Sequence, residues 1–306
     1  MRNIELQEIN ERCRKDPAAF ISESEAQYHA TICSVAETVC STYRERPIVL
    51  LNGPSSSGKT TTAWRLRDEL EKRGIHSHAI SMDDYYLTRG SYEMPRDEDG
   101  AEDLESPLCM DLNLLSHHLT ALAKGEIISV PQYDFAARCR TENTREIQLK
   151  KDEIAVIEGI HALNSMITEP LAAYATGVYM AVGTQVVLNK EERLAPHKLR
   201  FVRRAIRDKN FRDEPVIGTI RLWKSVRRGE KLYIHPYVPH AVRIIDTYLP
   251  YEDTILMNEL RELAQPYFTE MHEAGLDDVK DALELFEPMD RMDLIPDSSI
   301  MHEFIG

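Results

Sequence analysis

The sequence of 306 residues lacks the features of a secreted or membrane-spanning protein. Its five cysteines are odd in number and scattered, and no two form a C-x-x-C pair, which argues against a disulfide framework and a zinc site. No apolar run approaches the roughly eighteen residues that a membrane helix needs. The first residues also lack the apolar stretch of a secretory signal. These absences predict a cytoplasmic protein that has no membrane partner.

Positive charge is also scarce, with 37 Lys and Arg against 51 Asp and Glu and a formal net charge of −14. A general nucleic-acid binder needs a positive field, so nucleic acid is not an expected partner. Eleven basic residues nevertheless lie between residues 198 and 228, together with only three acidic ones. Such a segment is either a solvated helix face or a binding site for a polyanion. Residues 266–306 hold eleven acidic and two basic residues, and we expect a surface extension with one helix over 276–286.

Strand and helix patterns alternate after residue 46. Before it, apolar residues recur at three- and four-residue spacing, which predicts helices over residues 1–45. Short apolar runs predict strands at 47–52, 78–81, 127–130, 154–157, 178–182 and 242–245. Amphipathic stretches predict helices at 59–73 and 112–124. Short apolar strands separated by helices indicate an α/β protein with a parallel sheet covered on both faces.

The segment Gly53–Thr60 reads GPSSSGKT and matches G-x-x-x-x-G-K-[ST] at every fixed position. A predicted strand precedes it and a predicted helix follows it, as this phosphate loop requires. Its glycines let successive backbone N–H groups turn towards phosphate oxygens, and the helix adds its positive N-terminal end. Lys59 can reach the β- and γ-phosphates, and the Thr60 hydroxyl can bind Mg²⁺. The motif predicts a binding site for a nucleoside triphosphate.

Two carboxylates follow predicted strands, Asp83 after 78–81 and Glu158 at the end of 154–157. Open α/β sheets bind ligands at the carboxyl ends of their strands. A carboxylate at Asp83 can accept a proton from an attacking hydroxyl, and one at Glu158 can hold Mg²⁺ or its water. Either residue could instead end a strand or fill a loop without a catalytic role.

Taken in order, these motifs resemble the uridine kinase / phosphoribulokinase family of P-loop kinases, and in particular its bacterial uridine kinase-like nucleoside kinases. The resemblance covers residues 47–263 and also rests on the sequences DDYY at 83–86, ESPLCMD at 105–111, PQYDF at 131–135, EGI at 158–160 and RFVRRAIRD at 200–208. It implies a P-loop NTPase fold of the nucleoside/nucleotide kinase type, with three layers, a mostly parallel central sheet and a helical lid. We therefore expect an N-terminal helical extension over 1–45, a P-loop kinase domain over 46–265 and an acidic C-terminal extension over 266–306.

The resemblance also implies roles for individual residues. Asp83 matches the base that accepts the proton of a 5′-hydroxyl, Glu105 stands where an Asp usually holds ribose hydroxyls, and Tyr133 matches an aromatic residue beside the nucleoside base. The implied catalytic residues are Asp83, Lys59, Arg203 and Arg207. The implied ATP-binding residues are Gly53, Ser55, Ser56, Ser57, Gly58, Lys59, Thr60, Thr61, Arg204 and Arg212. The implied substrate-binding residues are Asp83, Tyr85, Glu105, Tyr133, Arg138 and Arg200, and Thr60 and Glu158 are the implied metal ligands.

The implied function is the Mg²⁺-dependent transfer of the γ-phosphate of ATP to the 5′-hydroxyl of a nucleoside, of the uridine or cytidine type, in pyrimidine salvage. One departure puts uridine itself in question, because Arg138 stands where eukaryotic-type uridine kinases read the pyrimidine with a His. Another acceptor of the family, such as pantothenate or a sugar phosphate, therefore stays open. So does a regulatory protein that binds a nucleotide and transfers nothing. Members of the family are often oligomers, so a homo-oligomer is also an open expectation.

Overall fold

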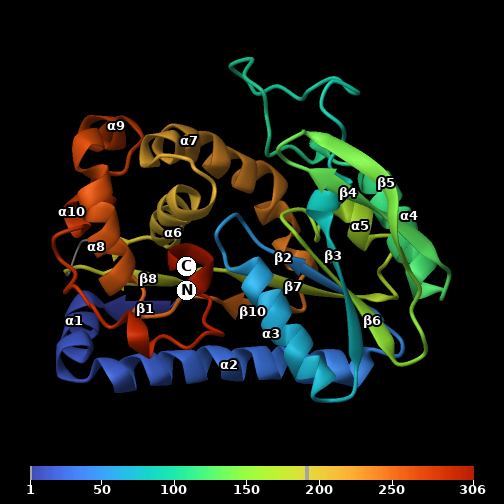
Figure 1. The fold of residues 1–306 in the computed structure, drawn as a ribbon, viewed down its shortest axis with the longest axis horizontal. Coiled ribbons are helices and arrows are strands. Elements are labelled where there is room, and N and C mark those ends of the chain that lie inside the picture. The colour runs from blue at the N-terminus through green and yellow to red at the C-terminus, as the bar shows by residue number, and fades with distance from the viewer. Residues whose placement is uncertain (1, 190–192) are drawn as a thin grey trace.

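A five-stranded sheet, in which every strand is parallel to its neighbours, forms the centre of the molecule (Figure 1). The computed structural model describes residues 2–189 and 193–306. The strands are β2 (Ile48–Asn52), β3 (His76–Ser81), β6 (Glu153–Gly159), β7 (Ala175–Ala181) and β10 (Arg243–Asp246). Their order is β10-β7-β2-β6-β3, so that β2 lies in the middle and pairs with both β6 and β7. This arrangement confirms the expected parallel sheet.

The two faces of the sheet belong to two separate hydrophobic clusters. Because successive side chains of a strand point to opposite faces, Val49 and Leu51 of β2 enter one cluster while Ile48 and Leu50 enter the other. Helices α2 (Pro17–Thr42) and α3 (Lys59–Glu71) contribute to the first cluster. Helices α4 (Leu112–Ala123) and α5 (Ser165–Thr168) contribute to the second. The three-layer architecture expected of this fold class is therefore confirmed.

The predicted strand at 127–130 does not join the central sheet. It belongs to β4 (Ile128–Asp134), which pairs antiparallel with β5 (Cys139–Ile147) in a separate hairpin. Pro131 has no N–H to donate, and the register of the pair shifts between Val130 and Gln132. Most of β5 is exposed, so one face of the hairpin is open to solvent. The expectation of a further sheet strand here was wrong.

The N-terminal segment begins with a strand rather than a helix. Strand β1 (Arg2–Glu5) pairs parallel with β8 (Thr184–Val187), which also pairs antiparallel with β9 (Arg193–Leu194). Helix α1 (Leu6–Lys15) follows, and Asp16 then caps α2 by accepting a hydrogen bond from the backbone N–H of Ala19. The helical expectation for residues 1–45 was wrong for this first strand. Strand β1 has only four residues, of which only Ile4 is buried, so its pattern is too short to be recognised in the sequence.

The basic segment forms two consecutive helices, α6 (Pro196–Phe211) and α7 (Val216–Tyr233). The short link between them includes Asp213, whose φ of 52° is in the left-handed region. Helix α8 (Asp253–Ala264) follows β10 and packs against α6. The described residues also form five 3₁₀ turns, at Met82–Tyr85, Pro107–Cys109, His235–His240, Gln265–Tyr267 and Met292–Leu294. None of the helices within residues 2–189 and 193–306 combines the length and the apolarity that crossing a membrane requires.

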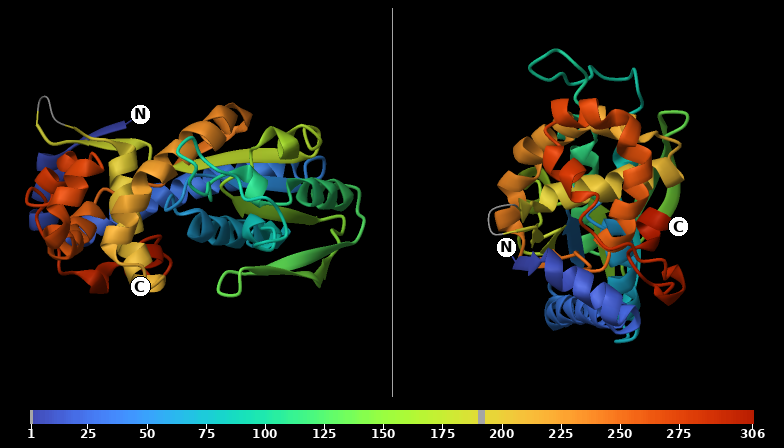
Figure 2. Two further views of the ribbon diagram at one scale, coloured as in Figure 1. Left: turned by 90° about the horizontal axis from the view of Figure 1, so that it is seen from above. Right: turned by 90° about the vertical axis from the view of Figure 1, so that its left-hand side faces the viewer.

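The acidic C-terminal region is not a surface extension. It forms α9 (Phe268–Glu273), α10 (Asp277–Ala282) and α11 (His302–Ile305), and the helix expected over 276–286 is only as long as α10. Its apolar residues are buried in the same cluster as β2 and β7, among them Leu276, Val279, Phe286, Ile300 and Phe304. With α6 and α8, these helices form one end of the molecule, and α4 and the β4–β5 hairpin form the other (Figure 2). In the sequence, the many acidic residues of this region obscure the apolar residues that pack in the core.

Candidate active site

The phosphate loop connects the carboxyl end of β2 to the first turn of α3. Ser56 and Gly58 have φ values of 58° and 80°, left-handed conformations that aim neighbouring N–H groups into one concavity. Glycine is required at Gly53, because a Cβ there would lie 2.2 Å from the carbonyl oxygen of Met180. The buried hydroxyls of Ser56 and Ser57 have no hydrogen-bond partner within the described part of the chain. Unpaired buried donors around a concavity at a helix N-terminus fit an anion with several phosphate oxygens.

Lys59 is the cation of this loop. Its Nζ donates a hydrogen bond to the carbonyl oxygen of Pro54, 3.0 Å away. Burial lowers the pKa of Lys59, and the carboxylates of Glu158, Glu303 and Asp83 oppose that shift. The ammonium group therefore lies within electrostatic reach of the two carboxylates that the sequence singled out.

Asp83 and Glu158 are linked through a shared hydroxyl group at the ends of β3 and β6. Ser81 donates a hydrogen bond to Oε1 of Glu158 at 2.9 Å, and the Ser81 oxygen accepts one from the backbone N–H of Asp83 at 3.3 Å. Burial raises the pKa of both carboxyl groups, and the charge of Lys59 opposes the rise. The structure thus brings the phosphate-loop lysine and both carboxylates together at one edge of the sheet.

Three arginines of the basic segment surround Asp208 beside this edge. Nε of Arg207 donates to Oδ1 of Asp208 at 2.8 Å, and Arg204 and Arg212 form ion pairs with the same carboxylate at 3.2 and 3.5 Å. Arg207 also reaches the hydroxyl of Ser55 in the phosphate loop, at 3.5 Å. One carboxylate neutralises only part of the charge of three guanidinium groups. The cluster therefore suits a polyanion bound next to the loop.

Two other arginines of α6 have structural positions. Arg200 donates to the carbonyl oxygen of Ser55 at 2.9 Å and pairs with Glu230, so it supports the phosphate loop from behind and does not line the aromatic pocket described below. Arg203 is fully buried and forms a two-pronged pair with Glu252, at 2.7 and 2.6 Å. A side chain held in this way is not free to contact a transferring phosphoryl group, which argues against the catalytic role expected for Arg203. The substrate contact expected for Arg200 is likewise not supported.

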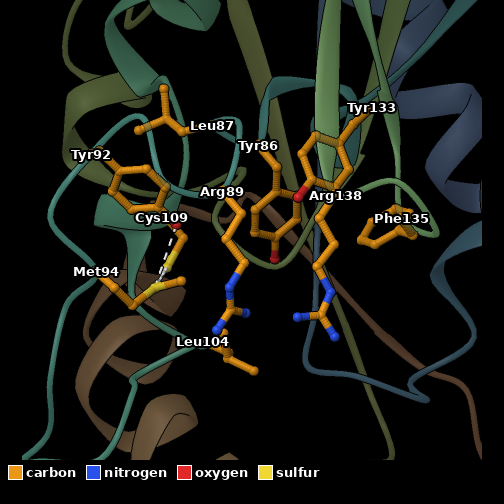
Figure 3. Close-up of a pocket in the computed structure, with 10 residues that line it drawn as sticks. All are labelled: Tyr86, Leu87, Arg89, Tyr92, Met94, Leu104, Cys109, Tyr133, Phe135 and Arg138. Atoms are coloured by element: carbon orange, nitrogen blue, oxygen red, sulfur yellow. Dashed lines mark hydrogen bonds between the residues drawn. The ribbon is translucent and has the colours of Figure 1, made fainter.

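An aromatic pocket of about 240 Å³ opens between the long loop at residues 87–106 and the β4–β5 hairpin (Figure 3). Three rings form its wall, with centroids 5.5 Å apart for Tyr86 and Tyr133 and 5.0 Å apart for Tyr133 and Phe135. The guanidinium groups of Arg89 and Arg138 extend beside Tyr86 and point in the same direction (Figure 3). Tyr133 and Arg138, two of the residues expected to bind the substrate, therefore line the same pocket.

Tyr85, expected to contact the substrate, does not line this pocket. It is fully buried in the core, where its hydroxyl forms a 2.9 Å hydrogen bond with Nδ1 of His118. Tyr86 lines the pocket instead, since the 3₁₀ turn at Met82–Tyr85 rotates the chain between the two tyrosines. The sequence shows two adjacent tyrosines at this point, but it does not indicate which of them faces the pocket.

Glu105 lies within electrostatic reach of Tyr86 in the pocket and of Arg204 in the arginine cluster. Its side chain packs so closely on α7 that a Cβ at Gly229 would lie 2.3 Å from the Cβ of Glu105. Burial raises the pKa of Glu105, and the charge of Arg204 opposes this. The pKa of Tyr86 is raised well above its ordinary value, first by burial and then by the carboxylates of Asp83 and Glu105. Tyr86 of the aromatic pocket is thus within electrostatic reach of both carboxylates.

His161 gives this region a predictable pH dependence. Burial lowers the pKa of His161 to about 4, against roughly 6.5 for the exposed ring in the unfolded chain. The unfolded state then binds a proton that the folded state refuses, so stability that is fully present above pH 6.5 is lost as the pH falls towards 4. We expect His161→Gln to remove about 2 kcal/mol of the decrease in unfolding free energy between pH 7 and pH 5, measured by urea denaturation. The exposed His76→Gln is the control, and an unchanged pH dependence in His161→Gln would contradict this account.

A phosphate loop at the carboxyl edge of a parallel sheet, two carboxylates beside its lysine and an arginine-bearing helix pair define a P-loop kinase. Residues 48–254 match the sequence model of the family described as Phosphoribulokinase / Uridine kinase family, and the chain belongs to that family. This confirms the resemblance seen in the sequence motifs.

Individual relatives and solved structures that the chain resembles carry different names. The uridine kinase of Staphylococcus aureus strain JH9 is 29% identical over 199 residues, which are 65% of this chain and 86% of the relative. Among solved structures, a candidate uridine kinase from Bacillus stearothermophilus is 21% identical with a TM-score of 0.47, and the alignment covers 71% of this chain and 98% of that one. D-glycerate 3-kinase from Cryptococcus neoformans is 18% identical with a TM-score of 0.34, over 50% and 71% of the two chains.

Proposed function

We propose that this kinase transfers the γ-phosphate of ATP, with Mg²⁺, to the 5′-hydroxyl of a nucleoside. The observation that carries the proposal is the aromatic pocket beside Asp83 and Glu105. A planar base can stack on Tyr86 and Tyr133, and Glu105 can accept hydrogen bonds from two ribose hydroxyls. The sugar end of such an acceptor then points towards Asp83 and the phosphate loop.

In this proposal, each side chain around the reacting atoms has a defined chemical role. Asp83 accepts the proton of the attacking hydroxyl and orients its oxygen. Lys59 and Arg207 stabilise the charge on the transferring phosphoryl group, and Arg204 and Arg212 extend that positive field. The Thr60 hydroxyl and the Glu158 carboxylate are oxygen donors of the kind that Mg²⁺ prefers, and they would hold it near Lys59. When bound, Mg²⁺ supplies charge that neutralises the phosphate oxygens.

A second candidate acceptor is a small anion, such as a sugar phosphate or the carboxylate of pantothenate. The two arginines of the pocket, Arg89 and Arg138, favour it. Arg89 is already paired with Glu102 at 2.5 Å, however, and the loop from residue 93 to 105 carries seven acidic residues. These charges repel an anionic acceptor and leave the neutral nucleoside as the better fit.

The test is Mg²⁺-dependent ATP consumption with uridine, cytidine, thymidine, purine nucleosides, pantothenate and ribulose 5-phosphate offered singly. We expect a nucleoside to stimulate turnover, and Tyr133→Ala to raise its KM at least about tenfold while changing the KM for ATP less than about twofold. Phe268→Ala, an exposed aromatic residue on α9, is the matched control. Stimulation by pantothenate or the sugar phosphate alone would replace the nucleoside proposal, and ATP consumption that needs no acceptor would oppose both.

A further inference from the structure

A cluster of ionisable side chains lies where α2 packs on α3, at the end of α3 that is farther from the phosphate loop (Figure 1). It consists of His29 and Cys33 of α2 and Glu69 of α3. His29 and Cys33 are four residues apart, so both side chains lie on one face of α2. Helix α2 precedes residues 48–254, the region that matches the family. The cluster therefore connects the N-terminal helices to the kinase domain.

Three atoms of this cluster that can bind a metal ion lie close to one another. Sγ of Cys33 is 3.5 Å from Nε2 of His29 and 3.6 Å from Oε2 of Glu69. The same Nε2 is 3.8 Å from Oε1 of Glu69. Bonds of roughly 2.3 Å to sulfur, 2.05 Å to nitrogen and 2.1 Å to oxygen, at tetrahedral angles, place the ligand atoms of a zinc ion about 3.4–3.6 Å apart. The spacing of the cluster thus matches three corners of a tetrahedral zinc site, with only small movements of the side chains required.

Glu69 is held in this position as an anion. Lys72 donates to its Oε1 at 2.5 Å and Arg73 donates to its Oε2 at 2.6 Å, and these hydrogen bonds lower the pKa of Glu69 to about 2. Each carboxylate oxygen has two lone pairs, so it can keep such a bond and still face a metal ion. Hydrogen bonds to a ligating carboxylate also fix its orientation. The two positive charges oppose a divalent ion, so we expect a weaker affinity than that of structural zinc sites.

We propose that His29, Cys33 and Glu69 form a zinc site that holds α2 against α3. Imidazole, thiolate and carboxylate together are a donor set typical of Zn²⁺, whereas Mg²⁺ prefers oxygen ligands alone. The Cys33 thiol gives its proton to solvent when the ion binds. The side chain of His29 is 47% exposed and that of Glu69 only 8%, so the ion enters from the His29 side and keeps water as its fourth ligand.

This site needs no second cysteine, which is why the scattered cysteines of the sequence do not reveal it. The third ligand comes from a different helix, 36 residues beyond Cys33. Two helices that pack on each other bring the ligands together, and the spacing of residues along either helix does not encode that contact.

The zinc site adds to polar contacts that already join α2 to α3. Glu25 forms an ion pair with Arg65 at 3.0 Å, and the hydroxyl groups of Tyr28 and Thr62 are hydrogen-bonded. The Thr62 hydroxyl also donates to the carbonyl oxygen of Gly58 in the phosphate loop, at 2.6 Å. A metal ion at the far end of α3 thus strengthens the contact on which this part of the loop rests. Because the unfolded chain does not hold the three ligands together, the bound ion stabilises the folded state by mass action.

Titration of the full-length, nucleotide-free protein with Co²⁺ tests the ligand set directly, because cobalt bound by a thiolate shows a charge-transfer absorption. We expect Co²⁺ to give this absorption and Zn²⁺ to displace it. Cys33→Ser should abolish the absorption, and His29→Gln should weaken the Zn²⁺ affinity at least about tenfold. Cys40→Ser is the matched control, because it changes another partly buried thiol of α2, and it should alter neither quantity.

Two further readouts need no spectroscopic metal. Zn²⁺ should slow the alkylation of Cys33 by iodoacetamide at least about tenfold and that of Cys40 less than about twofold, since a metal-bound thiolate is not a free nucleophile. Peptide mass spectrometry measures both rates in the same chain. A hundredfold excess of Zn²⁺ over its Kd should also raise the Tm by about 3 °C or more, and Cys33→Ser and His29→Gln should lose this increase.

Cobalt binding without the thiolate absorption would overturn the zinc site, and so would a Zn²⁺ affinity that both Cys33→Ser and His29→Gln leave unchanged. Equal protection of Cys33 and Cys40 from alkylation, or no binding of either metal at micromolar concentrations, would do the same. None of these measurements uses ATP or an acceptor. Their outcome is therefore independent of the proposed function, and the acceptor panel can fail or succeed without deciding this assignment.

Discussion

Asp83→Asn is expected to lower kcat at least about 100-fold, because an amide of the same shape cannot accept the proton of the attacking hydroxyl. Binding of ADP should change less than about threefold, since removing one carboxylate beside Lys59 does not weaken the phosphate loop. The two quantities are measured by steady-state turnover with the acceptor that the panel identifies and by calorimetry. Turnover within about threefold of the unaltered enzyme would remove Asp83 from its assigned role.

Asp84→Asn is the matched control, because it makes the same chemical change one residue away. Asp84 accepts a hydrogen bond from the backbone N–H of Tyr133 at 3.4 Å, so it positions the pocket rather than the reacting oxygen. We expect Asp84→Asn to raise the acceptor KM and to leave kcat within about fivefold. Burial raises the pKa of Asp83, so turnover of the unaltered enzyme should fall on acidification at a pH above that of an ordinary Asp. The residual turnover of Asp83→Asn should lack this decrease.

Local features of the sheet and of the phosphate loop could be predicted from the sequence. The run from Ile48 to Leu51 is continuously apolar because β2 is buried on both faces, and this is a purely local signal. The need for glycine in the loop is also a local effect, because Gly58 has a φ of 80°, in the left-handed region that favours glycine. Asp83 and Glu158 follow from the same logic, because the ends of parallel strands meet at one edge.

The choice between neighbouring residues could not be predicted. Tyr85 is the last residue of a 3₁₀ turn and Tyr86 follows it directly, yet Tyr85 enters the core and Tyr86 lines the pocket. Arg203 and Arg204 are neighbours about 100° apart around α6, yet Arg203 pairs with Glu252 in the core and Arg204 pairs with Asp208 in the arginine cluster. The partner of Arg203, Glu252, is 49 residues away in the chain, and no motif connects them.

The packing of the C-terminal region could not be predicted from the sequence for a related reason. Counting charges over residues 266–306 describes its solvent side, while Ile300 and Phe304 determine where it packs. A periodicity search in that region would have detected buried positions, but not that Ile300 meets Gly58. Contacts between segments more than two hundred residues apart depend on the assembled core, which a local pattern does not encode.

Arg203→Ala is expected to lower the free energy of unfolding by about 3–5 kcal/mol, because it leaves the carboxylate of Glu252 buried without its partner. It also removes the cation that lies 5.0 Å from the ring centroid of Phe304, which helps to hold the C-terminal segment. Urea denaturation measures the change. Arg204→Ala, also on α6, is the matched control and should cost less, since Asp208 keeps its pairing with Arg207.

The double variant Arg203→Met/Glu252→Gln separates a structural role from a catalytic one. With both charges removed, no uncompensated ion stays in the core, so we expect at least half of the lost stability to return. The loss in Arg203→Ala should also be smaller at pH 5 than at pH 8. Burial already raises the pKa of Glu252, and without the arginine its protonated form is favoured further, so the penalty grows as the pH rises through that pKa. If the double variant is stable but its kcat is more than about 100-fold reduced, Arg203 acts on the reaction itself, and a structural role in the core does not account for its effect. Turnover within about tenfold of the unaltered enzyme, together with recovered stability, is the result that this buried pair predicts.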